Sequence, residues 1–155
     1  MAIGTNDLID KFGTQGTITT GTPGSISSTS FSASGDVALW TNSDNAPLAQ
    51  FELTCQWATV TGVANKRVVI YARTMDVDGT TDPVAPSTNR KWMPIGAFLA
   101  YAAATSTNYT FDSGICRLPN AQASQQFEFY LENLTGQTIS SAWSMKIRPM
   151  TQGPA

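Results

Sequence analysis

The sequence contains no histidine. Histidine is the side chain most often used as a general base and as a metal ligand near neutral pH, so its absence removes the usual serine and cysteine triads. Two cysteines, Cys55 and Cys116, are too few for a zinc site built from cysteine and histidine. No GxSxG, GxGxxG or phosphate-binding loop motif occurs. We therefore expect no enzymatic activity, no catalytic residue, no metal site and no cofactor.

Charged side chains are also scarce, at 13% of residues against about 25% in an average domain. The net charge is −2 and the basic residues are scattered, so we expect no nucleic-acid binding. No apolar run is long enough to span a membrane. Serine, threonine, asparagine, glutamine and glycine must therefore cover much of the surface. A surface with few ionic groups to desolvate suits contact with other proteins, the alternative being a merely neutral soluble surface.

The N-terminal sequence MAIGTNDLID lacks the basic and apolar regions of a secretory signal. Free thiols in a cytosolic compartment are then the expectation. Cys55 alternates in phase with Phe51, Leu53 and Trp57, which predicts a small buried apolar residue. The sequence leaves open whether Cys55 and Cys116 are paired.

Residues 1–35 differ from the rest of the chain. Thr5–Gly13 fits one helical turn with Asn6 as its cap, and a stretch rich in threonine, serine and glycine follows. Such a stretch has too few apolar residues to fold by itself. We predict an extended N-terminal arm, ordered by a partner surface or by wrapping on its own domain. The candidate anchors that would bind the partner are its apolar residues, Leu8, Ile9, Phe12, Ile18, Ile26 and Phe31.

Residues 36–155 show a period close to two, which is typical of β-strands with one buried face. The pattern predicts an all-β fold, a single β-sandwich of about eight strands that is jelly-roll-like, with an immunoglobulin-like sandwich as the alternative. We expect the second and third strands to form a hairpin, and Pro149 to end the last strand. The predicted strands are residues 37–41, 51–59, 66–75, 95–101, 108–111, 115–118, 127–132 and 143–148.

One of these strands is ambiguous. Ile95, Phe98, Leu99 and Ala102 also fit helical spacing, so residues 95–104 are read either as strand or as helix. Strands on both sides favour the strand. Residues 76–91 form a loop longer than most hairpin loops.

Three weaker patterns suggest chemistry. The carboxylates Asp76, Asp78 and Asp82 suit a calcium loop, but their spacing is not that of an EF-hand and favours a solvated turn. Glu128 and Glu132 share a strand face with Tyr130, and we interpret them as an outward polar face rather than a glycosidase pair. Exposed Trp92 and Tyr101 would suit stacking on a sugar, and Glu128 with Asp112 would serve an enzyme that uses carboxylates alone.

Three features together resemble a known family: the phrase EFYLENLTGQTISSAWSMKIRP, the upstream DVALWTNSDNAPLAQFELTCQW, and the N-terminal arm. They resemble the small cement, or decoration, proteins of tailed-bacteriophage capsids. The resemblance implies a jelly-roll-like structural protein, made in the host cytoplasm and located on the outer surface of the virion. There it would bridge adjacent major capsid protein subunits, as a dimer or trimer, with an extended terminus on the shell. The alternative is a carbohydrate-binding β-sandwich module of a phage tail or fibre.

An arm of this kind predicts the effect of a truncation. Deleting residues 1–35 is expected to leave a folded sandwich, because the period-two pattern begins only at Asp36. The truncated protein is expected to bind expanded capsid shells more weakly than the full chain, which co-sedimentation measures. Unchanged affinity would contradict a binding role for the arm.

Overall fold

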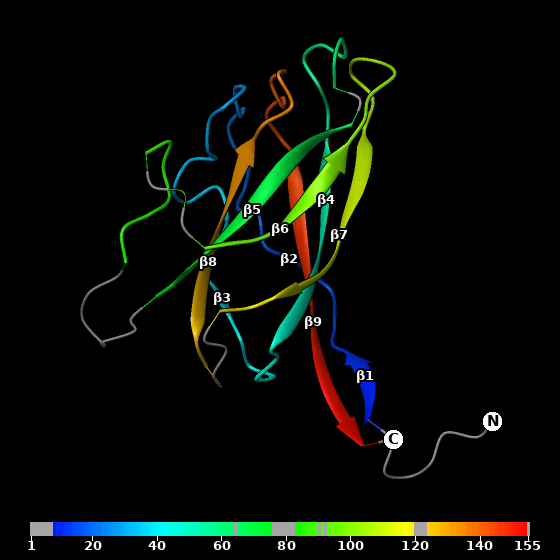
Figure 1. Ribbon diagram of the computed structural model, residues 1–155. Helices are drawn as coiled ribbons and strands as arrows, with labels where there is room; N and C mark the ends of the chain where they lie inside the picture. The colour runs from blue at the N-terminus through cyan, green and yellow to red at the C-terminus, as the bar shows by residue number, and fades with distance from the viewer. Residues whose placement is uncertain are drawn as a thin grey trace, which may run out of the picture.

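The protein folds as two antiparallel β-sheets packed face to face (Figure 1). The computed structural model describes residues 8–63, 65–75, 83–89, 91, 93–119 and 124–154, and these residues contain no helix. The strands are β1 (Leu8–Phe12), β2 (Gly16–Thr17), β3 (Trp40–Thr41), β4 (Leu48–Cys55), β5 (Lys66–Thr74), β6 (Pro94–Ala100), β7 (Tyr109–Arg117), β8 (Gln126–Asn133) and β9 (Ser144–Pro154).

The strand order confirms the predicted sandwich. One sheet has the order β1-β9-β4-β7, with β2 also pairing with β9, and the other has the order β3-β8-β5-β6. β1 and β2 pair with successive parts of β9, so they act as two halves of one interrupted strand. Counted in this way, the eight strands are arranged 1-8-3-6 and 2-7-4-5. This is the strand order of a jelly roll.

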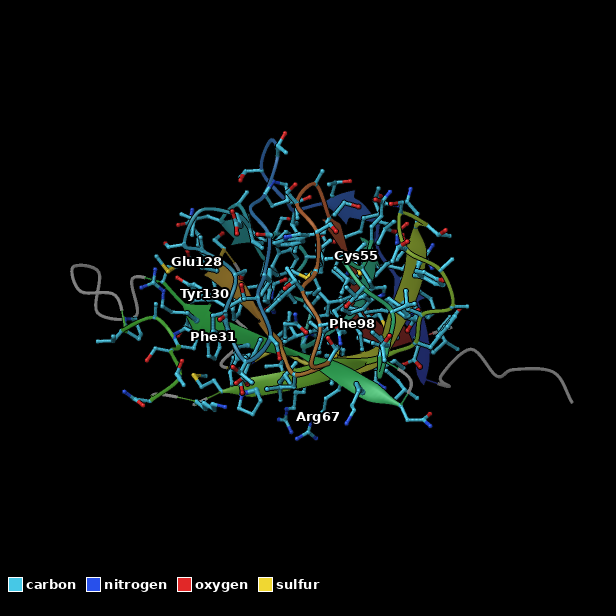
Figure 2. The ribbon with its side chains drawn as sticks, turned by 90° about the horizontal axis from the view of Figure 1, so that it is seen from above. Phe31, Cys55, Arg67, Phe98, Glu128 and Tyr130 are labelled. Carbon is cyan, nitrogen blue, oxygen red and sulfur yellow. The ribbon has the colours of Figure 1, made fainter. Side chains whose placement is uncertain are left out.

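The core lies between the two sheets and follows from the alternation in the sequence. Along β4 every second residue is buried, from Ala49 to Cys55. Trp57 and Trp143 are each 1% exposed, and Phe98 from the opposite sheet is fully buried between the layers (Figure 2). Burying such aromatic side chains removes up to about 250 Å² of surface each from water, which makes this layer the main source of stability.

The predicted N-terminal arm is part of the same core from β2 onward. The Ile18 amide donates to the Met145 carbonyl, and Ile26 and Ile139 exchange both backbone hydrogen bonds. Both isoleucine side chains are buried, Ile18 at 5% and Ile26 at 0% exposure. The apolar residues of this stretch are too few to form a core of their own, but they fill the open side of a core that the other strands build.

The predicted helical turn over Thr5–Gly13 is wrong where the structure describes it, because Leu8–Phe12 is a β-strand. β9 offers an unpaired edge to these residues from Met150 to Pro154. Pairing with that edge satisfies the backbone polar groups, so the tertiary contact overrides a local helical preference.

Pro149 does not end the last strand, since β9 continues to Pro154. The Pro149 carbonyl accepts from the Gly13 amide at 2.8 Å, so this side of the proline faces the break between β1 and β2. The missing N–H of the proline points to the same side, where no strand requires a donor. A side chain on Gly13 would lie 2.7 Å from the Pro149 ring, which explains the glycine.

The predicted hairpin of the second and third strands is also wrong. β4 pairs with β7 and β9, whereas β5 pairs with β6 and β8, so the two strands lie in different sheets. The segment between them, which contains the buried Trp57, crosses from one sheet to the other. Alternation identifies a buried face but not the sheet to which that face belongs.

The two short strands predicted at residues 108–111 and 115–118 are one strand, β7. Gly114 has a φ of +66°, and the register with β4 shifts between Gln50 and Glu52. The Ser113 hydroxyl accepts from the Phe51 amide at 2.9 Å. The serine and glycine therefore form a β-bulge instead of the predicted turn, and the side chain replaces a ladder hydrogen bond.

Residues 94–100 are a strand, which settles the ambiguity between helix and strand in favour of β6. β6 and β7 are the edge strands of the two sheets and lie against each other. A side chain on Gly96 would come within 2.3 Å of the Cys116 sulfur. The glycine therefore allows the two edges to close the sandwich on this side.

Cys55 and Cys116 are both buried and free. Cys116 lies opposite Ala49 on β4, whereas Cys55 lies opposite Tyr109. Six residues of extended strand separate Ala49 from Cys55, which is about 20 Å. A disulfide needs Cα atoms within about 7 Å, so the two cysteines cannot pair with each other in this fold.

The core position of Ile18 and Ile26 changes the expected result of the truncation. Deleting residues 1–12 removes only β1, and that protein is expected to stay folded. Deleting residues 1–35 also removes two buried side chains and their strand pairing, so it is expected to lower the free energy of unfolding by several kcal/mol. Urea unfolding of the two truncated proteins measures the difference. If the protein without residues 1–35 is as stable as the full chain, residues 1–35 are an arm that can be removed from the sandwich, as the sequence predicted.

The close approach of β6 and β7 gives a second prediction. Gly96→Ala forces a methyl group against the Cys116 sulfur and is expected to cost about 1–3 kcal/mol of stability. Adding Cys116→Ala removes the sulfur and leaves the Cys116 Cβ at 3.7 Å, an ordinary contact. The double variant should then be less destabilised than the sum of the two single variants. Strict additivity in urea unfolding would show that this contact does not limit the packing.

Candidate interaction surfaces

A two-stranded ribbon projects from the body of the sandwich (Figure 1). β4 pairs with β9 only as far as Met150, so the last residues of β9 pair with β1 alone. We call Leu8–Phe12 together with Met150–Pro154 the terminal ribbon. An isolated pair of strands is marginally stable in water. This ribbon therefore has much to gain from a surface that covers it.

Two of the predicted anchors, Ile9 and Phe12, lie on the terminal ribbon and have side chains that the structure describes. Phe12 is 54% exposed, and the Arg148 guanidinium lies 5.3 Å from the centre of its ring. Ile9 is half-buried. The backbone of Leu8 belongs to β1, but its side chain lies outside the described part of the structure. An exposed aromatic ring beside a cation is a combination common in protein interfaces.

The other three predicted anchors face their own domain. Ile18 and Ile26 are buried in the core and are not accessible to a partner in this fold. Phe31 lies against the Tyr71 ring, with 5.2 Å between the ring centres. These residues were candidate partner anchors because each is isolated in the sequence, whereas the structure shows the alternative, a segment that wraps on its own domain. The long-range pairing of their segment with β8 and β9 could not be read from that spacing.

The outer face of the β3-β8-β5-β6 sheet carries a buried polar cluster. Glu128, Tyr130 and Glu132 share this face of β8, as the alternation predicts (Figure 2). They are not solvent-exposed, because Glu128 is 5% and Glu132 is 0% exposed. Phe31 and the segment before β6 lie over them. The outward polar face that we predicted is therefore a covered one.

Glu132 is held by two side chains. The Tyr71 hydroxyl donates to Oε2 at 2.8 Å, and the Lys91 ammonium lies 2.5 Å from Oε1. Burial first, and then the hydrogen bond to Glu132, raise the pKa of Tyr71 to about 12. Tyr71 therefore remains a neutral donor at physiological pH. The pair fastens Lys91, at the end of the β5–β6 connection, to the sheet.

Glu128 is held in a similar way. It pairs with Arg73, and it accepts from the Ser34 hydroxyl at 3.1 Å. The Arg73 guanidinium also donates to the Pro83 carbonyl at 3.0 Å. Burial, and then the nearby Glu128 carboxylate, raise the pKa of Tyr130 to about 12. Each partner comes from a different segment, so the carboxylate ties the N-terminal segment and the β5–β6 connection to one face.

The structure does not bring Glu128 and Asp112 together. Glu128 lies on β8 and Asp112 on β7, in different sheets. Asp112 is exposed and accepts hydrogen bonds from Gln50 and from the Gly114 amide. A glycosidase needs two carboxyl groups that face one sugar ring, and these two residues do not form such a pair.

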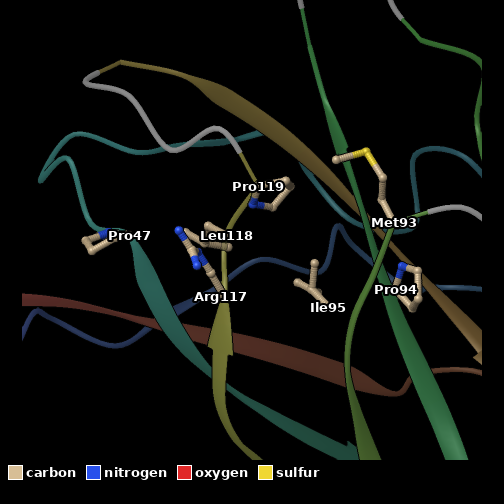
Figure 3. Close-up of a pocket in the computed structure, with 7 residues that line it drawn as sticks. All are labelled: Pro47, Met93, Pro94, Ile95, Arg117, Leu118 and Pro119. Atoms are coloured by element: carbon tan, nitrogen blue, oxygen red, sulfur yellow. The ribbon is translucent and has the colours of Figure 1, made fainter.

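Two hollows flank the start of β6. One has a volume of about 590 Å³ and lies where β4 begins, β6 begins and β7 ends (Figure 3). Its lining residues are Pro47, Met93, Pro94, Ile95, Arg117, Leu118 and Pro119. The other has a volume of about 600 Å³ and lies on the outer face of the β3-β8-β5-β6 sheet. Val69 and Ala97 are among its lining residues, and its polar groups are Arg67, Tyr71, Lys91 and Glu132.

Large apolar side chains are exposed on and next to the edge strands β6 and β7. Leu99 on β6 is 67% exposed, and Ile115 on β7 is 59% exposed. Tyr101 follows β6 and is 56% exposed, with its ring edge-on to Tyr109 and Phe111 at 5.5 and 5.4 Å. Of the two suggested sugar-stacking residues, Tyr101 is therefore exposed, whereas Trp92 lies outside the described residues.

In the described part of the chain, no group of three histidine, cysteine, aspartate or glutamate residues could hold a metal ion. The suggested calcium loop, Asp76, Asp78 and Asp82, lies outside the described residues. No described helix is long and apolar enough to cross a membrane.

Comparison with known protein families, with curated proteins and with solved structures finds no match for this chain. The assignment of its function therefore depends on the surfaces described above.

The buried cluster predicts that replacing Lys91 costs more stability than replacing Lys146. Lys91→Met leaves the fully buried Glu132 without its cation and is expected to cost about 2–3 kcal/mol of stability. Lys146→Met is the matched control, because its partner Glu52 is 30% exposed and stays hydrated. That change is expected to cost less than about 1 kcal/mol. Equal losses in urea unfolding would show that Lys91 does not compensate the buried charge.

Proposed function

We propose that this chain is a structural virion protein that binds the outer surface of an icosahedral phage capsid. It bridges adjacent major capsid protein subunits and so stabilises the shell. The jelly-roll strand order supports the proposal at the level of fold, since viral capsid proteins use this order, although lectins use it too. Because both classes of protein share this fold, it is the surfaces of the chain that distinguish the two functions.

The terminal ribbon is the observation that carries the proposal. It extends beyond the sandwich, and its base presents the exposed Phe12 ring. The outer edge of β1 has no strand partner among the described residues. A bridging protein needs an element that reaches past its own body to a second subunit. The ribbon has that form, and covering it on a shell would bury apolar surface and satisfy its unpaired backbone groups.

Binding of this kind stabilises a shell through linkage. A protein that binds only the expanded lattice adds RT ln(1 + [L]/Kd) per site, about 2.7 kcal/mol at 100 times Kd. A shell offers many copies of such a site, so modest contacts add up. The scarcity of charged side chains, 13% of the chain, lowers the desolvation cost at each contact.

Co-sedimentation with purified capsid shells tests the proposal. We expect saturable binding to expanded shells and weak binding to unexpanded ones. Phe12→Ala is expected to weaken binding at least tenfold. Leu39→Ala is the matched control, because Leu39 is 51% exposed and lies outside the terminal ribbon, and its affinity should stay within twofold. If the intact protein does not bind expanded shells, the proposed function is wrong.

Exposed Tyr101 favours one other candidate, a carbohydrate-binding module of a phage tail or fibre. Its ring is held at the surface by edge-to-face contacts with Tyr109 and Phe111. A glycan array separates the two functions. Hits that disappear in Tyr101→Ala would favour the carbohydrate-binding module, whereas no hits together with shell binding would favour the capsid protein.

A further inference from the structure

We propose that the chain has a second docking surface, around β6, which takes an acidic surface of its protein partner. This inference rests on the proposed function, because a bridging protein needs two separate contacts. We call the surface the β6 face and define it by Arg67, Val69, Lys91, Ala97 and Leu99. It is formed by strands β5 and β6 and by Lys91, on the outer face of their sheet and away from the terminal ribbon (Figure 1).

The hollow on the outer side of β6 gives this surface a receptive shape. Its volume of about 600 Å³ lies in the range of ordinary binding sites. Val69 and Ala97 give it an apolar lining, and the small Ala97 side chain leaves room beside Val69, which lies opposite it in the β5–β6 pairing. A protruding side chain of a partner could enter this space.

The charges around the hollow favour an anionic group. Glu132 is already compensated by Lys91 and by the Tyr71 hydroxyl. Arg67 makes no ion pair among the described residues, and Figure 2 shows it pointing away from the sheet. The three charged groups of the hollow, Arg67, Lys91 and Glu132, sum to +1, although the whole chain carries −2. A carboxylate placed between Arg67 and Lys91 would complete the set.

An exposed apolar side chain lies beside this positive site. Leu99 lies opposite Arg67 in the β5–β6 pairing, and it is 67% exposed. Apolar side chains next to two cations fit a partner surface that carries apolar side chains next to carboxylates.

Shell binding of two matched variants tests the β6 face. Arg67→Gln removes one positive charge from it, and Lys146→Gln removes one from the other sheet, where Lys146 pairs with Glu52. With expanded shells we expect Arg67→Gln to weaken binding at least fivefold and to reduce the salt dependence of binding. Lys146→Gln should stay within twofold. If Arg67→Gln binds as tightly as the intact protein, the β6 face is not a docking surface, while the proposed function still stands.

A second probe needs no capsid. In ¹⁵N NMR titrations, hexaglutamate is expected to shift the amides of Val69, Ala97 and Leu99 in the intact protein, and hexaglutamine is not. The shifts should be smaller in Arg67→Gln. The NMR titration tests the β6 face even if the intact protein does not bind shells. Failure to bind shells would overturn the proposed function alone. Equal shifts with both peptides, or shifts unrelated to β6, would overturn the β6 face.

Discussion

The pairing of the N-terminal strands with β9 is the interaction on which the rest of the structure depends. β9 holds β1 and β2 on one edge and β4 on the other, so it joins the first strands of the chain to the middle of the first sheet. The same pairing brings Ile18 into the core and joins β1 to the end of β9 in the terminal ribbon. Stability and the proposed contact with a shell therefore share one strand.

The sparse ionic groups are used in two different ways. Glu128 and Glu132 are buried and fasten separate segments to the outer face of the second sheet through Arg73 and Lys91. Their charges are matched inside the domain, which suits a rigid covered face rather than an acid–base pair. Arg67, in contrast, remains available to solvent beside an apolar patch. This division, in which the buried carboxylates are compensated inside the domain and Arg67 stays at the surface, supports a protein that works by contact.

Much of the fold could be predicted from the sequence, because alternation marks each half-buried strand. For residues 95–101 the strand was favoured over a helix because strands lie on both sides, and β6 confirms it. The pairing of β4 and β5 was not predictable, because alternation is the same whichever sheet a strand joins. Pro149 was expected to end the last strand and Gly114 to form a turn, and both expectations were wrong. Pro149 faces the break between β1 and β2, and Gly114 forms a β-bulge within β7. Of the six predicted anchors, Phe12 is the one whose described side chain is strongly exposed, since exposure depends on pairing between distant segments.

Hydrogen–deuterium exchange of the protein alone and on expanded shells tests the central claim most directly, because it reports which backbone amides a partner covers. The account predicts new protection in two separate places, at Leu8–Phe12 with the end of β9 and at the β6 face. The core strand β4 should not change, since it is already protected in the free protein. Unchanged exchange at both surfaces in the presence of saturating shells would contradict a role in bridging capsid subunits.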